Sequence, residues 1–420
     1  MKSVNYYYDE TLLSASRKNS PILLKLLLPE TLLLLGVFQA LFPYLIWAVS
    51  GVNENYSQKI NGAPVFLWVI GFLSFWIGAR LTSMSPAKKI IHANIRPRRM
   101  QFVLYLSLFF WSLLLFLVIN AYGGIPILEF LRGSLAVDAV NDAQASSVPG
   151  LFGIWLLSNT MLIISVTLSV ISRLSYKPIL STIIKVSIVA VIFGAIMAGK
   201  RQSLLIAATI IIPSIIIGIK FYLTKDISRS LSRRITFLTF ITFIVLIIVF
   251  GVIGQIRTGN DIKVNSGIQI FNYLEYPLIN MEWQLSEFGL LNGAGNIIPL
   301  VAGLIPYKLI SGTEYGLDNT FAIYSFFYPE PGIGAGFFGP VHLAFGIFGV
   351  VFFGAVTGFY SRKVFNLANS DQRWLVPYSC FVWPLVSAHS YSHFTSILFF
   401  MLPFVLSIFL SRYVFVKVKQ

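Results

Sequence analysis

Of the 420 residues of this chain, 56% are hydrophobic and only 11% are charged. A water-soluble protein of this length has too small an interior for so much apolar surface, so we predict an all-α membrane protein that crosses the bilayer many times. The net charge of +15 would suggest nucleic acid in a soluble protein. In a membrane protein, the excess of Lys and Arg in cytoplasmic loops explains it, and we expect no nucleic-acid partner.

The N-terminus is polar and aromatic and lacks the short apolar core and small-residue cleavage site of a signal peptide. The single cysteine, Cys380, lies in an apolar run. No intrachain disulfide is therefore expected, and a redox or metal role for this residue has no support.

Apolar runs close to 20 residues long recur along the chain, and a helix of that length crosses about 30 Å of hydrocarbon. We predict ten spanning segments: Leu28–Val49, Pro64–Leu81, Phe102–Asn120, Leu151–Ser172, Ile179–Met197, Leu204–Ile219, Ile235–Ile256, Phe337–Tyr360, Trp374–Ala388 and Phe394–Val414. An even number of crossings places both termini on the same side of the membrane.

The distribution of cations indicates which side this is. The loop after the second segment and the loop after the sixth segment are rich in Lys and Arg, and more cations follow the eighth segment and end the chain. Seven of the 31 Lys and Arg residues fall on the opposite side: Lys59, Arg132, Lys200, Arg201, Arg257, Lys263 and Lys308. The positive-inside rule therefore predicts that both termini are cytoplasmic.

The chain reads as one integral-membrane domain, 1–420, with two long external segments. The smaller is 121–150, and the larger is 257–336, which is rich in aromatic residues, carboxylates and glycine. Loops of this size are usually folded or functional. A weakly apolar piece of the larger loop, Ile297–Ile310, is a candidate interfacial or re-entrant helix, so we expect partly helical content there.

Two adjacent cations, Lys200 and Arg201, lie in a tight turn between the fifth and sixth segments, on the side where cations are scarce. Arg257 ends the seventh segment on the same side. Arg binds phosphate oxygens in a bidentate manner and Lys adds a point charge, so these residues are candidates for holding an anionic ligand. The alternatives are cations that snorkel at a helix end, or an Arg257 paired with Asp261 or a lipid headgroup.

Three of the four histidines fall at this same membrane boundary: His342, His389 and His393. Ionisable groups at membrane depth are costly and often functional, although a single interfacial histidine more often only forms hydrogen bonds. Their spacing is not that of a metal site. The acidic residues of the large loop are expected mostly on a solvated face, with one of them a possible acid or base: Glu275, Glu282, Glu287, Glu314 and Asp318.

The large loop also carries many Tyr, Trp and Phe residues, which suit stacking against sugar rings and equally suit an interfacial aromatic belt. A glycan carried on a lipid diphosphate would meet the aromatic residues and the cations in one place.

Three passages resemble the O-antigen polymerase family, which joins oligosaccharide repeat units in bacterial envelopes. They are Tyr122–Pro126, Gly199–Ser203, and Asp318–Phe321 followed by Gly339–Pro340 and Phe345–Gly349. Together with the predicted topology, the resemblance covers nearly the whole chain. Family members often have an acidic residue just before the Phe-Gly at this last helix entry, whereas this chain has Leu343-Ala344, so no acid is carried over to that point.

The resemblance implies a multi-pass enzyme of the bacterial inner membrane. It would transfer a glycan from polyprenyl diphosphate to the non-reducing end of another lipid-linked unit at the periplasmic face, without nucleotide sugar, metal or other cofactor. Arg201, helped by Lys200 and Arg257, would stabilise the diphosphate leaving group. Four side chains are candidates for the base that takes the acceptor proton: His389, His393, Glu275 and Asp318. His342 is a further candidate site residue.

The implied partners are the lipid-linked oligosaccharide and membrane lipid, with a chain-length regulator protein as a further candidate. Two alternatives stay open at this point. One is an O-antigen ligase, which shares the many spans, the large external loop and external Arg and His. The other is a transporter or flippase of lipid-linked glycans, which would place polar residues and broken helices near the membrane midplane.

Overall fold

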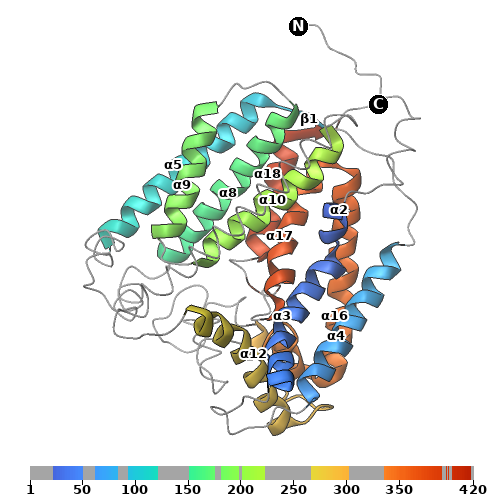
Figure 1. Ribbon diagram of the computed structural model, residues 1–420. Helices are drawn as coiled ribbons and strands as arrows, with labels where there is room; N and C mark the ends of the chain where they lie inside the picture. Colours follow the sequence, from blue (N-terminus) through green and yellow to red (C-terminus); the bar gives the residue numbers. More distant parts are fainter. Residues whose placement is uncertain are drawn as a thin grey trace.

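The computed structural model (Figure 1) describes residues 22–50, 62–83, 93–121, 151–175, 181–197, 201–222, 266–301, 335–389, 394, 396 and 400–417. These residues are almost entirely helical, which confirms the all-α prediction. Four of the described helices contain stretches long and apolar enough to cross a membrane: Ala63–Thr82, Pro97–Val118, Ile154–Ile171 and Gly339–Ser370. The full set of ten crossings and their orientation stay predictions.

The longer helices are α3 (Pro29–Ser50), α4 (Ala63–Ser83), α5 (Pro97–Ala121), α8 (Leu151–Ser175), α9 (Ser181–Met197), α10 (Arg201–Tyr222), α12 (Ser266–Phe288), α16 (Gly339–Ser370), α17 (Leu375–Val386) and α18 (Leu402–Val414). The short elements are α2 (Ile22–Leu26), α13 (Ile298–Val301), the 3₁₀ turns η1 (Gln372–Trp374) and η2 (Ser387–His389), and the strands β1 (Ala93–Ile95) and β2 (Phe415–Lys417). Nine predicted segments overlap these helices, and Ile235–Ile256 lies outside the described residues.

The helices form two groups that meet along α17 (Figure 1). In the group of α5, α8, α9 and α10, polar side chains join the helices. The hydroxyls of Ser107 on α5 and Ser165 on α8 are 2.7 Å apart, and Trp111 Nε1 donates to Asn159 Oδ1 at 3.2 Å. Hydrogen bonds of this kind hold helices together where neighbouring apolar surfaces supply little specificity.

In the other group, α4 packs against α16 through glycines. A Cβ atom added at Gly78 would lie 2.0 Å from the carbonyl oxygen of Ala355, and one added at Gly358 would lie 2.0 Å from that of Phe75. Backbone therefore touches backbone along this pair, which is the close approach that small residues allow between membrane helices.

Helix α17 contacts both groups. Its Ser379 hydroxyl lies 2.7 Å from that of Ser214 on α10, and its Tyr378 hydroxyl donates to the carbonyl oxygen of Leu27 ahead of α3. Leu375, one turn before Ser379, lies near Gly218, one turn after Ser214. The two helices α10 and α17 are therefore antiparallel.

Strands β1 and β2 pair antiparallel, with Asn94 opposite Val416. Because the two strands lie side by side, the predicted topology requires an even number of membrane crossings between them. The eight segments predicted between them satisfy this condition. Helix α12 lies at the opposite end of the molecule (Figure 1), and we call the two ends the β1 end and the α12 end.

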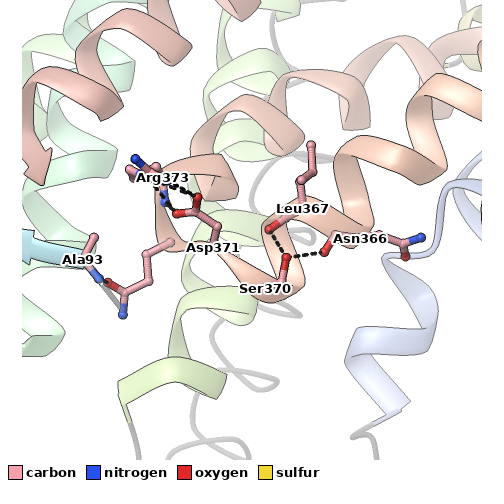
Figure 2. A network of polar contacts seen from close by, with 7 residues as sticks. Ala93, Asn366, Leu367, Ser370, Asp371 and Arg373 are labelled. Atoms are coloured by element: carbon pink, nitrogen blue, oxygen red, sulfur yellow. Dashed lines mark hydrogen bonds and ion pairs between the residues drawn. The ribbon is translucent and has the colours of Figure 1, made fainter. Parts of the chain in front are cut away.

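The described carboxylates at the β1 end are paired. Arg373 and Asp371 form a two-pronged contact whose shortest distance is 2.6 Å, as Figure 2 shows. The hydrogen bond to Asp371 raises the pKa of Arg373 above its ordinary value. Nearby, Gln372 Oε1 accepts from the backbone N–H of Ala93 at 3.1 Å, which ties η1 to β1.

A second ion pair joins α3 to α16. Arg362 Nη1 lies 3.1 Å and 3.2 Å from the two carboxylate oxygens of Glu30, and both side chains are mostly buried. The pair fixes the start of α3 against the long helix α16, about two turns before α16 ends.

The predicted span Phe337–Tyr360 overlaps α16, which contains one of the stretches able to cross a membrane, but α16 is not one straight helix. Gly346 has φ +64° and ψ −159°, which is not helical, and breaks α16 into a short arm before it and a long arm after it. The ring of Phe337 comes back to 5.3 Å from that of Phe353, although 16 residues of straight helix would span about 24 Å. The segment is therefore a helical hairpin, and only its long arm is extended enough to cross the membrane.

Candidate functional site

The short arm of the α16 hairpin, Gly339–Phe345, is buried along nearly its whole length at the α12 end. It is held there by α12. Gln284 on α12 donates through Nε2 to the carbonyl oxygen of Gly339 at 3.0 Å, and the same nitrogen lies 2.7 Å from Nδ1 of His342. Both side chains are fully buried. One amide group thus satisfies two acceptors of the short arm.

The second ring nitrogen of His342 completes the chain of hydrogen bonds. Nε2 lies 3.0 Å from the carbonyl oxygen of Leu290, in the turn that follows α12. A carbonyl oxygen only accepts, so Nε2 carries the proton and Nδ1 accepts from Gln284. His342 is therefore held as a neutral bridge between the large loop and the hairpin. With both nitrogens bonded, it is not a free base, and its role as a site residue is to position these elements.

Two glycines allow the large loop to pass directly over the corner of the hairpin. A Cβ atom at Gly346 would lie 2.3 Å from the carbonyl oxygen of Leu291, and one at Gly293 would lie 2.6 Å from the backbone nitrogen of Gly346. The positive φ of Gly346 adds a second reason for glycine at this position. The corner thus depends on backbone contacts that no larger side chain allows.

His389 ends η2 beside the start of the hairpin. The backbone N–H of Phe337 donates to the carbonyl oxygen of Ala388 at 2.7 Å, and a Cβ at Gly336 would lie 3.0 Å from the carbonyl oxygen of His389. The Nδ1 atom of His389 is buried and has no hydrogen-bond partner among the described residues. Of the two described histidines at this end, His389 is the one with a ring nitrogen that has no hydrogen-bond partner among the described residues.

The large loop contributes more buried polarity than the sequence indicated. Asn280, Glu282 and Gln284 on α12 are all buried, at 7% exposure or less. The expectation that Glu282 lies on a solvated loop face is therefore wrong, because α12 packs between α3, α4 and the hairpin. Glu287, near the end of α12, is exposed as expected.

Arg201 opens α10, and its side chain is outside the described atoms. Because α10 and α17 are antiparallel and meet at Ser214 and Ser379, the start of α10 points the same way as the end of α17. At 1.5 Å per residue, Arg201 lies about 20 Å along α10 from the contact, and His389 about 15 Å along α17. The structure thus places Arg201 and His389 towards the same end, without showing a contact between them.

The remaining candidates are only partly described. Glu275 lies on α12, but its side-chain surroundings are outside the described set. The other four predicted site residues lie outside the described residues altogether: Lys200, Arg257, Asp318 and His393. Within the described residues, there is no group of three or more His, Cys, Asp or Glu side chains able to hold a metal ion.

One residue of this site, Gln284, was missed from the sequence, and the burial of Glu282 was not expected. Both lie in a stretch where Leu278, Met281 and Leu285 recur at helical spacing. Such a stripe is typical of a helix with one buried face, and the neighbouring polar residues then become candidates for burial.

No family model, curated protein or solved structure matches this chain.

Proposed function

We propose that this protein is a membrane glycosyltransferase that polymerises oligosaccharide units carried on polyprenyl diphosphate. The observation that carries the proposal is the gathering of buried polar groups at the α12 end. His342, His389, Glu282 and Gln284 lie there, and α10 starts in the same direction with Arg201. The positive-inside rule assigns this end to the periplasm of a bacterial inner membrane, where lipid-linked units are joined.

In the proposed reaction, the hydroxyl oxygen at the non-reducing end of the acceptor attacks the anomeric carbon of the donor glycan. The bond from that carbon to the diphosphate oxygen breaks, and polyprenyl diphosphate leaves with the electron pair. Arg201, with Lys200 and Arg257, stabilises the growing negative charge. His389 takes the acceptor proton, since Nδ1 is buried and has no described partner. His393, Glu275 and Asp318 are the competing candidates for this role.

A transporter or flippase is less well supported. Such proteins place polar groups and interrupted helices around a central cavity near the midplane. Here the described interruption, Gly346, lies in the hairpin beside α12, and Glu30 and Arg362 neutralise each other as an ion pair between α3 and α16. An O-antigen ligase would use the same end of the molecule and differs in its acceptor, so the glycan products must separate it from a polymerase.

The test is complementation of a bacterial strain that lacks this gene, with surface glycan resolved on a gel and membrane expression measured. We expect a ladder from the wild-type protein and single repeats from Arg201→Ala and His389→Ala. Lys185→Ala is the matched control, because Lys185 is an exposed cation on α9 and should leave the ladder unchanged.

Other glycan patterns in the deletion strain or in the variants would favour a different function or exclude these residues. A deletion strain with no glycan on the core would favour a ligase, and one with repeat units facing the cytoplasm would favour a flippase. A deletion strain with a normal ladder would refute the polymerase. A normal ladder from both Arg201→Ala and His389→Ala would remove these residues from the mechanism.

A further inference from the structure

We propose that the β1 end carries a binding site for an anionic membrane lipid, formed by Arg96, Arg98, Arg99 and Arg412. We call these residues the arginine patch. Arg96, Arg98 and Arg412 are exposed and Arg99 is half-buried. The proposal is independent of the glycan chemistry at the α12 end.

The patch is assembled from two segments that are more than 300 residues apart in the chain. Pairing of β1 with β2 brings the start of α5 to the end of α18. The backbone N–H of Arg96 donates to the carbonyl oxygen of Val414 at 3.1 Å, and Arg99 Nη1 donates to that of Tyr413 at 3.4 Å. The fold therefore brings the segment that carries Arg96, Arg98 and Arg99 to the segment that carries Arg412, which a general excess of cytoplasmic cations does not require.

Aromatic rings hold two of these arginines. The guanidinium carbon of Arg99 lies 4.9 Å from the ring centroid of Tyr413, and that of Arg412 lies 5.8 Å from the ring of Trp374. Contacts of this kind orient a guanidinium group without neutralising it. Both arginines therefore stay available to an anion.

Among the described residues, no carboxylate neutralises the patch. Asp371 is held by Arg373 and Glu30 by Arg362. The first turn of α5 contains no acidic residue, although cations there oppose the helix dipole. An anion that binds several of these guanidinium groups would relieve their mutual repulsion, and phosphate oxygens match the geometry of arginine.

The surroundings favour a lipid over a soluble anion. The patch lies where α5 begins, and α5 contains one of the stretches able to cross a membrane. Phe102, Tyr105 and Tyr413 are exposed beside it, at 56%, 51% and 41%. A lipid would place its phosphate on the arginines and its acyl chains on this apolar surface. Clusters of Arg and Lys beside a membrane helix are typical of anionic-lipid recognition.

The experiment measures lipid binding and thermal unfolding of the purified full-length protein in neutral detergent. Phosphatidylglycerol, phosphatidylcholine and soluble glycerol phosphate are added in separate arms. For the wild type, we expect phosphatidylglycerol to raise the melting temperature, with no comparable shift from the other two compounds. In Arg96→Gln/Arg98→Gln, the phosphatidylglycerol concentration for half-saturation should rise about 30-fold.

Arg96 and Arg98 are chosen because their side chains are exposed and have no described contact to lose, so the lipid-free variant should be at least as stable as the wild type. Lys25→Gln/Lys363→Gln removes two exposed cations on α2 and α16 and is the matched control. Unchanged lipid binding in the arginine variant, or an equal loss in the lysine control, would overturn the proposal. An equal shift from phosphatidylcholine or from glycerol phosphate would overturn the assignment to an anionic lipid.

Discussion

The two ends of the molecule stabilise their polar groups by different means. At the β1 end, Arg362–Glu30 and Arg373–Asp371 are ion pairs with partial exposure to their surroundings. At the α12 end, Gln284 and His342 are fully buried and form a neutral hydrogen-bonded chain. Burying a charge costs far more than burying a hydrogen-bonded neutral group, so a neutral Gln284–His342 pair is the less costly arrangement for two fully buried side chains.

This difference suggests a division of roles. The pair Arg362–Glu30 joins α16 to α3, and the pair Arg373–Asp371 closes the turn η1. The neutral network at the α12 end fixes the large loop on the hairpin, and the buried Nδ1 of His389 nearby has no hydrogen-bond partner among the described residues. Four predictions test the contrast, from the largest expected effect to the smallest.

Gly346→Ala should be the most damaging single change. It places a Cβ about 2.3 Å from the carbonyl oxygen of Leu291 and forces a side chain onto a positive φ, so we expect a loss of about 3 kcal/mol or more. Gly295→Ala is the control, because its φ is also positive, +67°, but no atom lies within 4 Å of its Cβ position. It should cost about 1 kcal/mol. Equal losses in thermal unfolding would refute the close crossing at the corner.

His342→Ala should destabilise the protein by about 3 kcal/mol, because it removes the hydrogen bonds that the Gln284 amide and the Leu290 carbonyl form with the buried His342 ring. Gln284→Ala should cost a similar amount. The double variant should cost clearly less than the sum, by about 1–2 kcal/mol, since both changes break one network. If the losses of unfolding free energy in the two single variants simply add up in the double variant, the network is contradicted. Added salt should leave the losses of all three variants unchanged, because the network is neutral.

Glu30→Gln should cost about 2 kcal/mol, because it leaves the mostly buried Arg362 without its carboxylate. Glu287→Gln, a change of an exposed carboxylate on α12, should have almost no effect. In contrast to the His342 variant, the loss from Glu30→Gln should shrink at high salt. If the stability loss in Glu30→Gln does not change with salt, the contrast between ion pairs at the β1 end and a neutral network at the α12 end is contradicted.

Arg373→Ala should have the smallest effect, about 0.5–1 kcal/mol, since a quarter of the side chain is exposed. The hydrogen bond to Asp371 raises the pKa of Arg373 above its ordinary value. The stabilisation from a raised pKa is complete below the ordinary value and is lost only as pH rises through the folded-state pKa. Titration of Arg373 should therefore cause no change in stability between about pH 6 and 9, and a change in the wild type that Arg373→Ala abolishes would contradict this.

The sequence was a good guide to the helices and a poor guide to the hairpin. Apolar runs fix where helices form, so the segments beginning at Leu28, Pro64 and Phe102 lie close to α3, α4 and α5. The run from Phe337 to Tyr360 is equally apolar, and nothing local in it shows that Gly346 reverses the chain. That conformation depends on the backbone of the large loop, about 50 residues earlier in the chain.

The candidate site could likewise be predicted only in part, because its contacts join residues that are far apart in the chain. His342 was expected at the membrane boundary and lies at the α12 end, but its partners Gln284 and Leu290 come from a distant loop and gave no local signal. The wrong expectation for Glu282 has the same cause. A carboxylate in a polar loop is usually solvated, and only the packing of α12 between other helices buries it.

The most direct test of the account is the side of the membrane that each end faces. Cys380, the single cysteine, is buried and is replaced by Ala. A new cysteine is then placed at Leu291, which is 65% exposed at the α12 end, or at Arg98, which is exposed at the β1 end. We expect a membrane-impermeant maleimide to label Leu291→Cys in intact spheroplasts, and to label Arg98→Cys only after the membrane is opened. The reverse pattern would place the α12 end in the cytoplasm and contradict glycan polymerisation there.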